Sequence, residues 1–160
     1  MFDHKLINSI QNLLLKRKET IAVAESVTSG LLQFAFSNAE NAAKFYQGGL
    51  TAYNLGQKCR HLHIEPIHAF SCNCVSDQTA SEMATGIADL FKSDWGLGIT
   101  GYATPVPESE NKIFAFYAIS YKAKILNTQI ISPGKMDFLK VQLFYVHKLL
   151  DSLNDLLASV

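Results

Sequence analysis

Short apolar runs alternate with stretches of helical spacing along this chain, and that alternation restricts its fold more than any other feature. Residues 20–24 and residues 95–99 are short and almost wholly apolar, which is typical of buried strands. Apolar residues spaced three and four apart lie before, between and after these runs, as in amphipathic helices. Alternating strands and helices predict a layered α/β sheet.

The remaining elements follow from the same two periodicities. Further strands are expected at residues 49–53, 113–121 and 124–131. Helices are expected at residues 6–18, 31–36, a short segment around Lys58, 76–91 with Ser76 as its cap, and 139–157. The last helix has an apolar face wider than one stripe, so we expect it either inside the core or at a dimer interface. We expect a homo-oligomer, a dimer or larger.

The balance of charge argues against polyanionic partners. The 160 residues include 14 basic and 14 acidic ones, so we expect neither nucleic acid nor membrane as a partner. No run approaches the roughly 20 apolar residues of a membrane span, and the N-terminal basic cluster follows the apolar part, unlike in a secretory signal. The three cysteines do not indicate a disulfide framework. We therefore expect a single cytoplasmic domain, residues 1–160, that stands alone.

Two of the predicted strands are followed directly by candidate site residues. Glu25-Ser26 follows residues 20–24, and Thr100-Gly101 follows residues 95–99. Ligands of open α/β sheets bind beyond the carboxyl ends of the strands, so these four residues predict a site. A serine where a strand passes into a helix can be a nucleophile beside unpaired helix amides. The alternative is that Ser26 or Thr28 only caps the helix.

Four sequence blocks occur in the order found in one family. The stretch Ala24-Glu25-Ser26-Val27-Thr28-Ser29-Gly30 is similar to A-E-S-C-T-G-G, and Gly48-Gly49 through Tyr53-Asn54 to Lys58 is similar to G-G-x-x-x-Y-S/N-x-x-x-K. Cys74-Val75-Ser76 resembles the A-V-S that opens the family's middle helix, and Gly98-Ile99-Thr100-Gly101 resembles the strand end before I-A-G-P. Together they resemble the CinA C-terminal domain family, whose members include nicotinamide-nucleotide amidases.

The resemblance implies a fold and a reaction. The fold is a three-layer α/β/α sandwich around a mixed sheet. The reaction is hydrolysis of the carboxamide of nicotinamide mononucleotide, a step of pyridine nucleotide salvage, with no metal and no organic cofactor. Ser26 is the implied nucleophile, and Lys58 and Tyr53 are its implied partners in proton transfer. The implied substrate contacts are Glu25, Thr28, Gly30, Asn54, Thr100 and Gly101.

The chain departs from the family pattern where a phosphate would be held. The family's glycine-rich loop is replaced by residues 102–108, which contain Tyr102 and two prolines and no glycine. Proline lacks the N–H that a phosphate needs. The family's C-terminal arginines are also missing, and Lys135 and Lys140 are the nearest basic positions. An alternative function is therefore a non-catalytic or repurposed module that binds a small molecule or a nucleotide.

A cluster of cysteine and histidine residues offers a third hypothesis, a metal-dependent regulatory domain. Thiolate and imidazole are preferred zinc ligands. Two pairs are spaced two apart, and on an extended strand the members of each pair would share a face. The alternative is a loop with surface histidines and half-buried cysteines. The cluster comprises Cys59, His61, His63, His68, Cys72 and Cys74.

Overall fold

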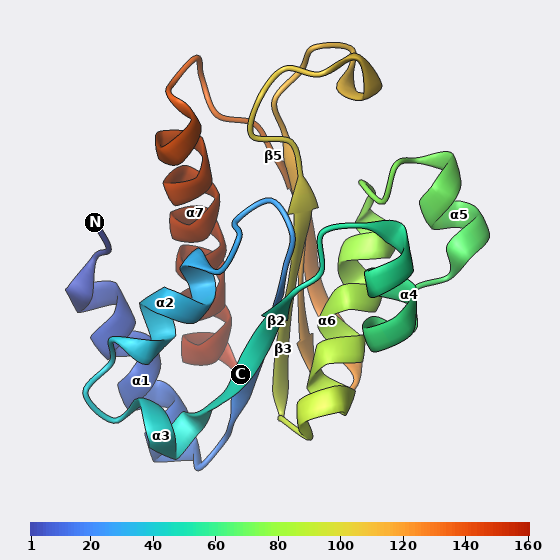
Figure 1. Ribbon diagram of the computed structural model, residues 1–160. Helices are drawn as coiled ribbons and strands as arrows, with labels where there is room; N and C mark the ends of the chain where they lie inside the picture. Colours follow the sequence, from blue (N-terminus) through green and yellow to red (C-terminus); the bar gives the residue numbers. More distant parts are fainter.

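A five-stranded mixed sheet forms the middle layer of the computed structural model, which describes all 160 residues (Figure 1). The strand order is β2-β1-β3-β4-β5; the pairs β1–β2 and β1–β3 are parallel, and β3–β4 and β4–β5 are antiparallel. The strands are β1 (Ile21–Glu25), β2 (Tyr46–Thr51), β3 (Trp95–Gly101), β4 (Ala115–Tyr121) and β5 (Lys124–Ile131).

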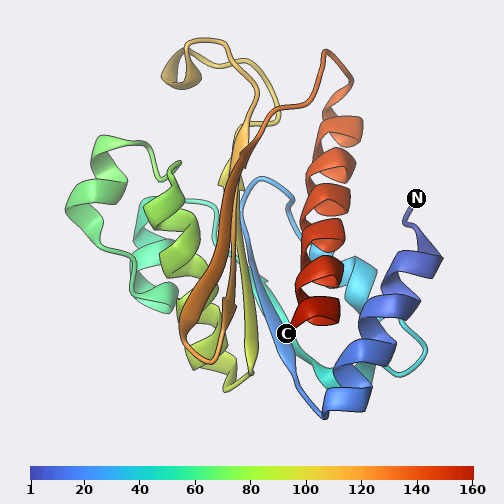
Figure 2. The same ribbon diagram turned by 180° about the vertical axis from the view of Figure 1, so that it is seen from behind.

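Helices cover both faces of this sheet, as the two opposite views show (Figures 1 and 2). One face carries α1 (His4–Arg17), α2 (Leu31–Ser37), α3 (Ala42–Phe45) and α7 (Phe138–Ser159). The other carries α4 (Leu55–Leu62), α5 (Pro66–Ser71) and α6 (Asp77–Phe91), and a 3-10 turn (Pro107–Ser109) lies in the loop after β3. The predicted three-layer α/β/α sandwich around a mixed sheet is confirmed.

Strand β1 shows why two helical layers are needed. All five of its side chains are buried, and the four apolar ones alternate between two cores. Ile21 and Val23 belong to the larger core under α1, α2 and α7, whereas Ala22 and Ala24 belong to the smaller core under α4 and α6. A strand that is apolar on both faces must be covered on both, which places its carboxyl end inside a rigid frame.

Helix α6 lies unusually close to strand β3 because that strand carries glycine on the facing side. A Cβ at Gly96 would lie 2.0 Å from the carbonyl oxygen of Ala84, and one at Gly98 would lie 2.3 Å from that of Ala80. Only glycine therefore permits this approach between helix and strand. The contact fixes the position of β3, which carries Thr100 near its end.

The structure also corrects and completes the predicted elements. Helices α3 and α5 were not predicted, and β2 begins at Tyr46, earlier than expected. Ser76 caps α6 as predicted, accepting a hydrogen bond from the backbone N–H of Thr79 at 3.0 Å. Most of the wide apolar face of α7 is buried in the core, the first of its two predicted places. No helix combines the length and apolar character that crossing a bilayer requires.

Candidate active site

The carboxyl ends of β2, β1 and β3 meet at one edge of the sheet. The N–H of Ser26 donates to the carbonyl of Ile99 at 3.1 Å, and the N–H of Ala52 donates to the carbonyl of Glu25 at 2.9 Å. These bonds continue the parallel pairing one residue beyond the ends of β1 and β2. They hold Ser26 between Ala52 and the end of β3, which carries Thr100, as expected for a site at strand ends.

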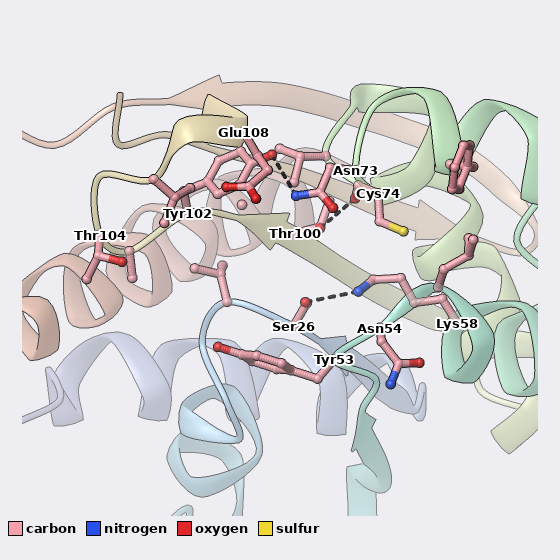
Figure 3. A pocket seen from close by; sticks show the side chains of 18 of the residues that line it. Ser26, Tyr53, Asn54, Lys58, Asn73, Cys74, Thr100, Tyr102, Thr104 and Glu108 are labelled. Carbon is pink, nitrogen blue, oxygen red and sulfur yellow. Dashed lines mark hydrogen bonds between the residues drawn. The ribbon is translucent and has the colours of Figure 1, made fainter. Parts of the chain in front are cut away.

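Lys58 points from the first turns of α4 directly at the serine (Figure 3). Its Nζ lies 3.1 Å from Ser26 Oγ and 2.9 Å from the carbonyl oxygen of Ala52. The helix is positioned by Asn54, whose side chain accepts from the N–H of Gln57. Lys58 is 2% exposed and Ser26 is 8% exposed, so the pair is largely shielded from water.

The surroundings of Lys58 favour its neutral form. Burial lowers the pKa of its amine, while the neighbouring Cys74 opposes that shift; burial likewise raises the pKa of the Cys74 thiol. No carboxylate forms an ion pair with Lys58. A neutral amine at this place can donate to the carbonyl of Ala52 and accept the proton of Ser26.

The loop after Ser26 is built around the carboxylate of Glu25. That carboxylate is fully buried and accepts hydrogen bonds from four donors. The donors are the hydroxyl of Thr28 and the N–H groups of Gly30, Leu32 and Gln33. The chain turns back to reach it through two left-handed residues, Ser29 at φ 49° and Gly30 at φ 94°. Glu25 thus satisfies the first amides of α2 from inside the protein.

Two backbone amides beside the nucleophile have no partner within the chain. The N–H groups of Val27 and Thr28 make no hydrogen bond, whereas that of Ser29 donates to the carbonyl of Ser26 at 3.1 Å. The carbonyl of Val27 is held by the Gln142 side chain of α7 at 2.8 Å. Free N–H groups on an anchored loop are the donors that an oxyanion requires.

A cavity of about 440 Å³ opens beside the serine–lysine pair. Six of the predicted site residues line it, namely Ser26, Tyr53, Asn54, Lys58, Thr100 and Gly101. The structure does not bring the other three, Glu25, Thr28 and Gly30, to its surface. Their hydrogen bonds with one another shape the loop from behind, and Glu25 and Thr28 are fully buried. This placement does not support direct substrate contact by those three residues.

Tyr53 lies at the mouth of the cavity. Its side chain is 68% exposed and makes no hydrogen bond with Ser26 or Lys58. In Figure 3 its ring lies beside Ser26 and its hydroxyl points away from Lys58. The predicted part of Tyr53 in proton transfer would thus need a bound substrate or a rotation of its side chain.

The wall opposite Ser26 comes from residues that the sequence did not single out as a site. The hydroxyl of Tyr102 accepts from Asn73 Nδ2 at 3.1 Å, and its carbonyl accepts from the hydroxyl of Tyr145 at 2.8 Å. Tyr102 therefore lies across the cavity from Ser26 and does not fill the space beside it (Figure 3). Gln142, which holds the carbonyl of Val27, was also missed, although a polar side chain within the wide apolar face of α7 was a sequence signal for it. Nothing in the sequence indicated that the hydroxyl of Tyr145 would bond Tyr102.

The cysteines and histidines do not gather into a metal site. No group of three or more His, Cys, Asp or Glu side chains is placed to hold a metal ion. No strand forms here, since His63 is the C-cap residue of α4 and Cys72 is the C-cap residue of α5. His68 instead bonds Ser76 at 2.8 Å. The alternative arrangement, with surface histidines and partly buried cysteines, is the one observed for His61, His63, Cys59 and Cys72.

The fold and this site define a three-layer α/β protein with a buried serine–lysine pair at the edge of its sheet. The chain belongs to the CinA C-terminal domain family, whose model matches residues 3–153. It is 40% identical over 111 residues to a CinA-like protein of Prochlorococcus marinus, covering 69% of this chain and 26% of that protein. The chain thus spans about a quarter of the length of such relatives.

Solved structures of the same superfamily share the fold over nearly the whole chain. The Competence-Damaged Protein (CinA) superfamily protein of Klebsiella pneumoniae superimposes with a TM-score of 0.93 at 26% identity, over 100% of both chains. A competence or damage-inducible protein of Enterobacter asburiae gives a TM-score of 0.89 at 28% identity, over 96% of each chain.

Proposed function

We propose that this chain hydrolyses a small carboxamide to a carboxylate and ammonia, by acyl transfer through Ser26. One observation carries the proposal: Lys58 Nζ lies 3.1 Å from Ser26 Oγ. The amine is buried and has no carboxylate partner, which favours the neutral form that a base requires. The adjoining cavity gives a small molecule access to the pair.

The first half of the reaction forms an acyl-enzyme. The neutral amine of Lys58 takes the proton of Ser26 while Oγ attacks the carbonyl carbon of the amide. The negative charge that develops on the carbonyl oxygen is stabilised by the free N–H group of Val27, a residue that lines the cavity. As the C–N bond breaks, Lys58 returns the proton to the leaving nitrogen, and ammonia departs.

The second half regenerates the serine. A water molecule attacks the ester carbon and gives a proton to Lys58, which passes it to Ser26 Oγ as the C–O bond breaks. The net change is the addition of one water to one amide, giving a carboxylic acid and ammonia. All proton transfers use Lys58, so activity requires its deprotonated form and should fall as pH falls.

Nicotinamide mononucleotide is the reference substrate, because the family resemblance implies it. Ammonia release by the purified protein, measured by a coupled dehydrogenase assay, tests the proposal. We expect turnover by the wild type and none by Ser26→Ala, with both proteins folded by circular dichroism. A panel of small carboxamides, including nicotinamide itself, belongs in the same assay. Failure of the wild type on every amide would refute the proposal.

A second candidate is a binding module that keeps the fold without the reaction. It is favoured by the exposed Tyr53, whose hydroxyl contacts neither Ser26 nor Lys58. Saturable binding of a ligand that is recovered unchanged would support this candidate. Under either function we propose a homo-oligomer, which analytical ultracentrifugation would test.

A further inference from the structure

Helix α7 begins at the cavity, which its first residue Phe138 lines, and two polar side chains on one of its faces reach the cavity walls. Gln142 and Tyr145 are three positions apart, so they are neighbours on the helix surface. Gln142 is 5% exposed and Tyr145 is fully buried. A buried amide or hydroxyl is costly unless it forms a hydrogen bond, so the partners of these two side chains show what they do.

Gln142 holds the nucleophile loop. Its Nε2 donates to the carbonyl oxygen of Val27 at 2.8 Å, and that oxygen has no other hydrogen-bond partner. Val27 follows Ser26 directly and lines the cavity, and its N–H is the proposed oxyanion donor. The N–H of Ser26 is held by β3, and the hydroxyl of Thr28 is held by Glu25. No hydrogen bond other than that from Gln142 holds the peptide that joins Val27 to Thr28.

Tyr145 holds the opposite wall. Its hydroxyl donates to the carbonyl oxygen of Tyr102 at 2.8 Å, and that oxygen also has no other partner. Burial raises the pKa of Tyr145, so the hydroxyl keeps the proton that it donates. Tyr102 lies across the cavity from Ser26 (Figure 3). Its N–H is held by the carbonyl of Phe114 at 2.8 Å, so the bond from Tyr145 completes the anchoring of this wall.

We propose that Gln142 and Tyr145 are positioning residues, which together hold the two walls of the cavity at the separation that the reaction requires. Gln142 acts on the side of the oxyanion donor, and Tyr145 acts on the side that meets the body of the substrate. Both belong to one helix whose apolar face is buried in the larger core, so the spacing of two side chains on a single element fixes the two walls. The inference rests on the proposed amidase function for its kinetic test, and not for its hydrogen-exchange test.

The kinetic test separates the two residues by the constant that each should change. In Gln142→Met, the Val27 N–H loses its alignment with an oxygen that becomes negative only in the transition state. The value of kcat should therefore fall by about ten- to a hundredfold, with KM within about threefold of the wild type. In Tyr145→Phe, the wall that meets the bound substrate loosens, so KM should rise by about threefold or more while kcat changes less. The pH at which activity rises should stay the same in both variants, because the surroundings of Lys58 are unchanged.

Two matched controls make the same substitutions away from the cavity. Gln11 is also 5% exposed, and its side chain accepts a hydrogen bond from the N–H of Asn41 at 3.1 Å. The hydroxyl of Tyr121 donates to Glu19 at 2.7 Å. Neither Gln11 nor Tyr121 lines the cavity, so Gln11→Met and Tyr121→Phe should lower the urea midpoint and leave kcat and KM nearly unchanged. Unchanged kinetics in either α7 variant, or equal changes in its control, would overturn the inference.

Hydrogen exchange of backbone amides, measured by NMR, tests the two anchors without turnover. The N–H of Ser29 donates back to the carbonyl of Ser26 at 3.1 Å, so its exchange reports on the nucleophile loop. The N–H of Tyr102 donates to Phe114, so its exchange reports on the opposite wall. These two amides are the loop reporter and the wall reporter.

Each reporter should respond to one variant and not to its control. The loop reporter should exchange about tenfold faster in Gln142→Met than in Gln11→Met. The wall reporter should exchange about tenfold faster in Tyr145→Phe than in Tyr121→Phe. These results would support the two anchors even if the wild type hydrolyses no amide, an outcome that refutes the proposed function alone. Exchange rates equal to those of the controls would overturn the inference even if hydrolysis is observed.

Discussion

The buried carboxylate of Glu25 organises the nucleophile loop, so Glu25→Gln should damage both stability and activity. One carboxylate oxygen accepts from Thr28, Gly30 and Leu32, and the other accepts from Gln33. Glutamine keeps only one acceptor oxygen, so its NH₂ group must face at least one donor. The preferred orientation keeps the three bonds and sets the NH₂ against the N–H of Gln33.

The cost follows from these four bonds. Losing one charge-assisted bond to a buried donor costs about 1.5–3 kcal/mol, and the three that remain weaken because the acceptor is no longer charged. The total loss in the free energy of unfolding is about 4 kcal/mol, within the 5–15 kcal/mol that a typical domain has. With a urea m-value of about 2 kcal/mol/M, the midpoint should fall by about 2 M.

Urea unfolding followed by circular dichroism measures this change, and ammonia release measures the activity of the folded variant. Glu40→Gln is the matched control, because Glu40 is exposed and its side chain makes no hydrogen bond. The control midpoint should move by less than about 0.25 M. A Glu25→Gln midpoint within about 0.5 M of the wild type would refute the reasoning that the four bonds hold this loop.

Other predictions concern Lys58 and the close approach of α6 to β3. Lys58→Met should lower kcat by about 10²–10⁴-fold, the usual contribution of a general base, in the same ammonia assay. Burial lowers the pKa of Lys58 in the folded state, so between that lowered pKa and the ordinary 10.5 the unfolded state binds more protons than the folded state. The free energy of unfolding of the wild type should therefore rise with pH across this range. Urea midpoints of Lys58→Met should lack that rise. Gly98→Ala should cost about 3 kcal/mol in urea unfolding, because its Cβ would lie 2.3 Å from a backbone carbonyl of α6. Gly134→Ala, where a Cβ meets nothing within 4 Å, should leave stability nearly unchanged, and equal effects at both glycines would contradict the account.

The sequence predicted the layered sheet because its helices and buried strands leave strong local signals, whereas the serine–lysine pair was expected only from the family resemblance. Long periodic stretches identified α1, α6 and α7, and continuous apolar runs identified β1 and β3. Helices α3 and α5 have four and six residues, too few for periodicity to reveal. Lys58 was expected beside Ser26 because of the family resemblance. The distance of 3.1 Å between Lys58 Nζ and Ser26 Oγ confirms that the two side chains are in contact, and their roles stay a prediction.

Backbone geometry explains why Glu25 and Cys74 lie elsewhere than the sequence predicted. Glu25 was expected to touch substrate, but it turns inward because Ser29 and Gly30 adopt left-handed conformations that bring the α2 amides back over it. Cys74 likewise has φ 59°, which breaks the strand that the cysteine spacing suggested. Positive φ at a residue other than glycine has little sequence signal. The polar side chain of Gln142 stood out within the apolar face of α7, but nothing in the sequence indicated that its partner would be Val27.

The covalent intermediate at Ser26 is the most direct test of the central claim. The protein is mixed with a p-nitrophenyl ester, quenched in acid and digested, and its peptides are weighed by mass spectrometry. The account predicts the acyl group on Ser26 in the wild type, none in Ser26→Ala, and slower acylation by about 10²-fold or more in Lys58→Met. An unmodified Ser26 in the wild type, or acylation as fast without the lysine as with it, would contradict the claim that this pair performs acyl transfer.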